Sequence, residues 1–312
     1  MGMFDDHEIY NDWSLADSHE RFAVAMRWFD LFVGARNPPS PVWNETRQGP
    51  MPPAAPRLMP GETSFELDVA VHGSAVVKPR YYSFDRGTAA SFFVLDTRQY
   101  ASPPPERGGP SDPARRTKLG AVQLAHLLDW LRTTPATFKF IASPVAWASG
   151  VFKFVQDGWA AFEFERDLIF DYIVAHRITG VVLLSADLHW AGCMHFKRWN
   201  LVEFTISPIQ SFGLPAHVRH DDNQELQYQS MWRNHFGEME VFDDDAAPTG
   251  TAGKDAGNNA GPYLNLNIYR YRYDEPKIVH RVRINLSDMA PGPADRSPAQ
   301  QTEIEPSLWI GL

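Results

Sequence analysis

Apolar strand-like and helix-like segments alternate through the middle of the chain, and this alternation limits the fold more than any other feature. The expected elements are a hairpin over 81–98, a helix over 120–134, a strand over 138–147, a helix over 162–177, and strands over 180–190 and 202–210. The strands are rich in apolar residues, and the helices repeat apolar residues at helical spacing. This order predicts an α/β sandwich with a mostly parallel sheet.

The flanking sequence predicts further elements around this central unit. In chain order they are a helix over 18–36, a Pro-rich flexible loop over 37–61, a strand over 65–73, a flexible low-complexity loop over 243–262, and a hairpin of strands over 264–274 and 277–286. No sharp change of composition divides the chain. We therefore expect one domain over 1–290 and a C-terminal tail over 291–312.

Composition excludes some classes of protein and leaves others open. The chain has 312 residues and a formal net charge of -9, which argues against a binder of nucleic-acid backbones. Bound metal ions could still supply positive charge for phosphate chemistry. Cys193 is the only cysteine, so an intrachain disulfide is impossible. We find no apolar run of the roughly 20 residues needed to span a bilayer and no signal peptide.

The strongest local signal for chemistry is an apolar strand that leads directly into Asp187-Leu188-His189. Functional groups gather at the carboxyl ends of strands in parallel α/β sheets. If this segment is extended, Asp187 and His189 point to the same side and form part of a metal site. The alternative is that Asp187 caps a turn and His189 is a half-buried structural histidine.

A second signal stands almost at the start of the chain, where Phe4 is followed by Asp5-Asp6-His7-Glu8. Carboxylates suit hard cations, and imidazole suits iron, zinc or manganese. A histidine beside such ligands could also give a proton to a leaving alkoxide. The alternative is a solvated acidic N-terminus.

A third signal is Arg98, which follows Asp96 at the end of another buried strand. Its planar guanidinium could clamp a phosphate, or it could pair with Asp96 or a helix end. The serine–proline pairs that begin at Ser143 and Ser207 are expected to shape turns. The sequence contains no nucleophile elbow, phosphate-binding glycine loop or dinucleotide fingerprint.

The order of several motifs resembles that of the PhoD-like alkaline phosphatases, a family of the calcineurin-like metallophosphoesterase superfamily. The motifs are FDDHE (4–8), VLDTRQY (94–100), ASPVAW (142–147), DGWAAFEFER (157–166), LLSADLHW (183–190) and EFTISPI (203–209). The resemblance runs from residue 4 to about residue 214 and implies an α/β/β/α sandwich with mixed sheets.

The resemblance implies a role for each matching residue. Asp6 stands where the family has a metal ligand, with Asp5 beside it, and His7 stands where a histidine contacts phosphate and assists the leaving group. Asp187 and His189 match two metal ligands. Arg98 lies in the Asp-x-Arg segment and is assigned to the catalytic group. Ala186 replaces the usual glycine, which would cost about 1 kcal/mol or more if the backbone approaches the metals closely or needs a positive φ there.

The implied reaction is hydrolysis of a small phosphate mono- or diester by metal-bound hydroxide. The resemblance implies calcium and iron, with manganese or zinc as alternatives. Family members have a βαβ segment before the FDDHE motif, and they are often exported. We therefore expect this chain to begin inside the family domain and its hydrolysis to be impaired. The alternative is a non-catalytic family member that acts as a binding or structural module.

Overall fold

The computed structural model describes most of the chain in separate ranges. These are residues 3, 5, 9, 22–38, 40, 43–44, 49–50, 71–72, 75–76, 79–103, 105, 108–149, 157–207, 223–231, 234–242, 261–272 and 275–291. The predicted loops at 37–61 and 243–262, the strand at 65–73 and the tail at 291–312 fall largely or wholly outside these ranges.

A seven-stranded mixed sheet forms the centre of the fold. Its spatial order is β11-β9-β10-β8-β7-β6-β5. The strands are β5 (Tyr82–Arg86), β6 (Ala90–Val94), β7 (Phe138–Ala142), β8 (Val181–Ser185), β9 (Ala191–Phe196), β10 (Leu201–Thr205) and β11 (Gln224–Ser230). Strands β6, β7, β8 and β10 are parallel to their neighbours in this group, and the outer pairs are antiparallel. The carboxyl ends of the four parallel strands therefore meet at one edge of the sheet.

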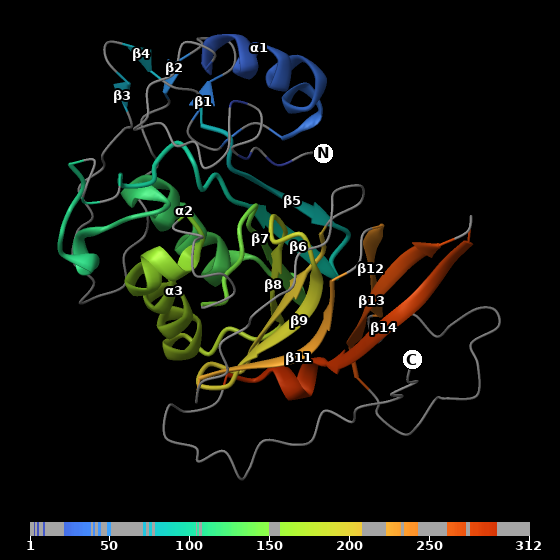
Figure 1. Ribbon diagram of the computed structural model, residues 1–312. Coiled ribbons are helices and arrows are strands. Elements are labelled where there is room, and N and C mark those ends of the chain that lie inside the picture. The colour runs from blue at the N-terminus through green and yellow to red at the C-terminus, as the bar shows by residue number, and fades with distance from the viewer. Residues whose placement is uncertain are drawn as a thin grey trace.

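Two helices cover one face of this sheet, α2 (Gly120–Thr133) and α3 (Glu163–Ala175), as Figure 1 shows. They bury their apolar residues in a core that includes Leu127, Ile169 and Phe170, each of which is fully buried. Two stacked tryptophans, Trp147 and Trp159, extend this core beneath α3, with their ring centroids 4.2 Å apart. The helical periodicity of the sequence arises from this one-sided burial.

A second sheet packs on the opposite face, with the order β12-β13-β14 (Figure 1). Its strands are β12 (His235–Phe242), β13 (Tyr263–Arg272) and β14 (Glu275–Asn285). Leu264, Leu266 and Ile268 of β13 enter a second core together with Phe138 and Phe140 of β7. The described residues thus form three layers, one of helices and two of sheet.

The remaining elements lie near the N-terminus. They are α1 (Phe22–Phe32) and two short antiparallel pairs, β1 (Trp43–Asn44) with β2 (Gly49–Pro50) and β3 (Val71–His72) with β4 (Ala75–Val76). Figure 1 places this group at one end of the large sheet, beyond α2. Within the described part of the chain, we find no helix with the length and apolar character needed to cross a membrane.

Candidate functional site

The segment after β8 forms a tight turn around Asp187. The strand ends at Ser185, and the backbone N–H of Leu188 donates to the carbonyl of Ala186 over 2.9 Å. The φ angles of Asp187 and His189 are 71° and 55°. The expectation of an extended segment is therefore wrong, because two left-handed residues turn the chain.

Asp187 and His189 are two of five described non-glycine residues with a positive φ, and they are the two that stand in one turn after a parallel strand. Left-handed φ angles in non-glycine residues cost energy, and such residues cluster at functional sites. Asp187 and His189 are both partly exposed. The expected strain at Ala186 is not found, because Ala186 has no positive φ and the left-handed positions are the two that follow it.

Arg98 connects two distant segments by ion pairs. Its Nε donates to Asp5 Oδ1 over 2.7 Å and its Nη1 donates to Asp157 Oδ2 over 2.6 Å. The side chain of Arg98 is 2% exposed. Both carboxylates come from residues far away in the chain, and Asp157 lies just before the helical turn Trp159–Phe162.

The loop that bears Arg98 is fixed by its own hydrogen bonds. Asp96 accepts hydrogen bonds from the backbone N–H groups of Arg98 and Gln99 through Oδ1, over 3.2 and 3.0 Å. The side chain of Gln123 on α2 accepts from the Asp96 N–H and donates to the Asp96 carbonyl, both over 2.8 Å. Asp96 thus stabilises the backbone at this strand end, and α2 anchors it from the side.

Lys118 and Glu165 form a second buried group beside Arg98. Glu165 accepts from the backbone N–H groups of Lys118 and Leu119 over 2.6 and 3.1 Å. The ammonium of Lys118 donates to the carbonyl of Asp157. Burial lowers the pKa of Lys118 to about 8 and raises the pKa of Glu165. Glu165 therefore holds the N-terminal end of α2 against α3.

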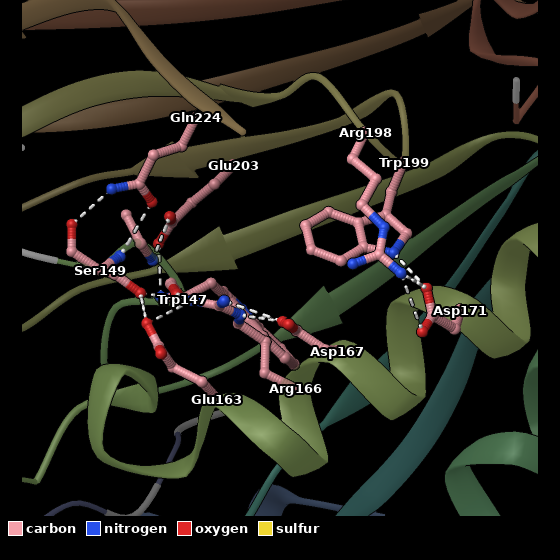
Figure 2. Close-up of polar contacts among 11 residues, drawn as sticks. Trp147, Ser149, Glu163, Arg166, Asp167, Asp171, Arg198, Trp199, Glu203 and Gln224 are labelled. Carbon is pink, nitrogen blue, oxygen red and sulfur yellow. Dashed lines mark hydrogen bonds and ion pairs between the residues drawn. The ribbon is translucent and has the colours of Figure 1, made fainter. Parts of the chain in front are cut away.

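Glu203 of β10 holds the loop after β7 in a similar way (Figure 2). Its Oε1 accepts from the backbone N–H of Trp147 and its Oε2 from that of Ala148, each over 2.9 Å. The hydroxyl of Ser185 also donates to Oε1, over 2.5 Å. Glu203 is fully buried, and this burial raises its pKa.

The same loop is held at its far end by side chains from α3 and β11 (Figure 2). Gln224 accepts from the backbone N–H of Ser149 over 3.0 Å and donates to its carbonyl over 2.6 Å. Arg166 donates to the Ser149 hydroxyl over 2.6 Å. At the start of the loop, the hydroxyl of Ser143 donates to the carbonyl of Val145 over 2.6 Å, as expected for a turn-shaping serine.

The predicted N-terminal site is described only in part. Asp5 is placed beside Arg98, whereas Asp6, His7 and Glu8 lie outside the described residues. Among the residues whose positions are given, no group of three or more His, Cys, Asp or Glu side chains is arranged to hold a metal ion. The assignments of Asp5, Asp6, Asp187 and His189 to metal, and of His7 and Arg98 to catalysis, stay predictions.

The carboxylate of Asp187 and the imidazole of His189 form a donor set suited to a metal ion. They come from one strained turn at the carboxyl edge of the central sheet, and the loops that bear Arg98 and Trp147 leave the same edge. The chemistry of the donor set is therefore compatible with the predicted metal site.

Sequence reasoning did not assign functions to four charged residues around this site. Lys118, Glu165 and Glu203 are buried, and Asp157 is partly buried. Asp157 and Glu165 lie in a motif that supported the family resemblance, and Glu203 begins another. The only available signal was the placement of charged residues within otherwise apolar segments, since such charges need a buried partner.

The described residues define a layered α/β protein whose candidate site lies at the carboxyl edge of a mixed sheet. The chain belongs to the PhoD-like phosphatase family, because the model of that family matches residues 1–247. The resemblance predicted from motif order is thereby confirmed.

Two relatives support this assignment. Over 166 residues the chain is 31% identical to alkaline phosphatase D of Bacillus subtilis (strain 168), an alignment that covers 47% of this chain and 28% of the relative. A solved structure described as "Structure of PhoD" matches with a TM-score of 0.56 and 17% identity, covering 91% of this chain and 52% of the other. The predicted fold class is confirmed by this match. The chain spans about a quarter to a half of the length of these relatives.

Proposed function

We propose that this protein is a metal-dependent phosphoesterase that hydrolyses small phosphate mono- or diesters. The observation that carries the proposal is the left-handed Asp187-Leu188-His189 turn at the end of β8, in a chain that belongs to a phosphatase family. Backbone strain of this kind persists where a site needs particular side-chain directions.

Each predicted residue has a proposed role in this reaction. Asp187 and His189 hold metal, together with Asp6 and Asp5 from the N-terminal segment. His7 donates a proton to the leaving alkoxide. When bound, the metal ions lower the pKa of the attacking water and neutralise charge on the phosphoryl oxygens.

Arg98 supports this site by orientation and charge. Its guanidinium is buried against Asp5, so it fixes one proposed ligand segment beside the edge of the sheet. The family resemblance points to calcium and iron, and the donor types also suit manganese or zinc.

The proposal is tested with Asp187→Asn. Asparagine tolerates the left-handed conformation, so we expect the unfolding free energy to change by less than about 1 kcal/mol. It lacks the negative charge, so we expect metal-dependent hydrolysis to fall by about 100-fold or more. The matched control is Asp129→Asn, which removes a partly exposed carboxylate of α2 that pairs with Arg132 over 2.7 Å.

The assay measures hydrolysis of an aryl phosphate and an aryl phosphodiester with calcium, iron, manganese and zinc in turn. It is carried out on the 312-residue chain. Absence of hydrolysis under every metal condition would refute the proposal and favour a non-catalytic binding module. Equal activities of Asp187→Asn and Asp129→Asn would refute the assignment of Asp187.

A further inference from the structure

Arg98 is held between two carboxylates that belong to different segments of the chain. Asp5 belongs to the N-terminal segment, and Asp157 lies just before the short helical turn Trp159–Phe162 that leads into α3. The two hydrogen bonds use Nε and Nη1, which are separate positions on the rigid guanidinium. The position of Asp157 therefore sets the orientation of Arg98, and Arg98 sets the position of Asp5.

Asp157 is itself firmly anchored. Its carbonyl accepts from the ammonium of Lys118, whose nitrogen lies 4.8 Å from the centroid of the Phe162 ring. Two residues further on, Trp159 is fully buried, and its indole N–H donates to the Ser143 hydroxyl over 3.0 Å. Asp157 is thus partly exposed itself but is joined to the buried Lys118 and lies two residues before the buried Trp159.

The N-terminal segment has two described attachments to the rest of the protein. One is the ion pair of Asp5 with Arg98, and the other is Ile9, which is buried in a small cluster with Met26 and Phe29 of α1. The residues proposed for metal binding and proton donation, Asp6 and His7, stand between these attachments in the sequence.

We propose that Asp157 is a positioning residue, which holds Arg98 and through it Asp5. The proposal rests on the proposed function, since Asp5 is one of its assigned metal ligands. Asp157 contacts neither substrate nor metal in this scheme. Asp157 acts only through Arg98, and the hydrogen bond from the Lys118 ammonium to the Asp157 carbonyl helps to hold Asp157 in place.

The test compares Asp157→Asn with Asp171→Asn in the full chain. Asp171 lies further along α3 and pairs with Arg198 over 3.2 Å, with both side chains about half exposed. Amide hydrogen exchange is measured by mass spectrometry, without metal or substrate, in peptides that cover residues 3–9. We expect exchange there to rise by about tenfold in Asp157→Asn, because a charge-assisted bond becomes a neutral one. Exchange in β13 and β14 should not change, and Asp171→Asn should leave both regions unchanged.

The route through Arg98 is tested by a double-mutant cycle. Arg98→Lys keeps the charge but loses the fork that spans both carboxylates, so it should increase N-terminal exchange by itself. Adding Asp157→Asn to Arg98→Lys should cause less than about a twofold further increase, because the two changes break the same connection. Multiplicative effects of the two changes would overturn the proposal, as would unchanged exchange in Asp157→Asn. If Asp157→Asn does not fold, unchanged N-terminal exchange in Arg98→Lys alone overturns it.

Kinetics separate this proposal from the proposed function. In an active protein, Asp157→Asn should lower kcat by about tenfold with a smaller change in KM, because the assigned metal ligand Asp5 is displaced while the substrate is not. A protein without hydrolysis but with the coupled exchange behaviour refutes only the phosphoesterase function. A protein that hydrolyses substrate normally in Asp157→Asn, with unchanged exchange, refutes only the positioning role.

Discussion

Replacing Glu203 with glutamine should destabilise the protein more than any other change of a single polar atom at this edge of the sheet. Glu203 is fully buried, and its two oxygens serve different donors. Oε1 accepts from Trp147 N–H and the Ser185 hydroxyl, and Oε2 accepts from Ala148 N–H. Glutamine has the same shape but only one accepting oxygen.

The cost follows from the better of the two orientations of the amide. If the amide oxygen takes the place of Oε1, the bonds to Trp147 and Ser185 remain and Ala148 N–H faces an NH₂ group. One buried backbone donor is then unsatisfied, which costs about 1–3 kcal/mol, and the facing donors add repulsion. We therefore expect a loss of about 2–3 kcal/mol in the free energy of unfolding.

Urea denaturation at pH 7 measures this loss, with an unchanged m-value as the sign that only stability has changed. The control is Glu225→Gln, an exposed position on β11 whose carboxylate lies 3.6 Å from the ammonium of Lys197. The control should cost less than about 0.5 kcal/mol. If Glu203→Gln unfolds at the same urea concentration as the control, Glu203 does not hold the loop and the reasoning fails.

Three further outcomes are expected. The pKa of Lys118 is about 8 in the folded protein, so between pH 8 and about 10 the unfolded chain holds a proton that the folded chain has lost, and the free energy of unfolding should rise with pH. Lys118→Met should remove about 2–3 kcal/mol of this rise between pH 7 and 10. Urea denaturation midpoints at each pH measure the difference. At Gly180, where φ is 74°, an added Cβ would lie 2.1 Å from the carbonyl oxygen of Thr137, so Gly180→Ala should lower the free energy of unfolding by more than about 3 kcal/mol. The control Gly87→Ala has a φ of 61° but no atom within 4 Å of the added Cβ, and it should cost only about 1 kcal/mol. Similar melting temperatures for the two variants would contradict this prediction. Burial raises the pKa of Cys193 to about 12, so a thiol reagent should label this residue only after the protein unfolds. Rapid labelling of the folded protein would show that Cys193 is accessible to solvent and would contradict this prediction.

The regular elements were predictable wherever their pattern was local. The helix predicted over 120–134 is α2, and the hairpin predicted over 264–274 and 277–286 is β13 with β14. These segments bury one face, so their periodicity records the burial directly. Strand β9 was missed because all its residues are buried, which leaves no alternation, and β11 was missed because its sequence is mostly polar.

The candidate site was predictable only at its strand ends. Asp187 and His189 were proposed because an apolar strand leads into them, yet the left-handed turn at these positions contains no glycine, and its only local signal is that Asp and His tolerate a positive φ. The local sequence left open whether Arg98 binds phosphate, Asp96 or a helix end. In the structure Arg98 pairs with Asp5 and Asp157, at 93 and 59 residues from it in the sequence.

The sequence by itself determined the class of fold, the family and the residues that end the parallel strands, because each of these depends on short-range patterns and on their order. Only the tertiary structure decided which buried charges meet. A charge such as that of Arg98 or Lys118 can be buried only where a counter-group is brought to it, and the path of the chain around the sheet selects that group from distant segments.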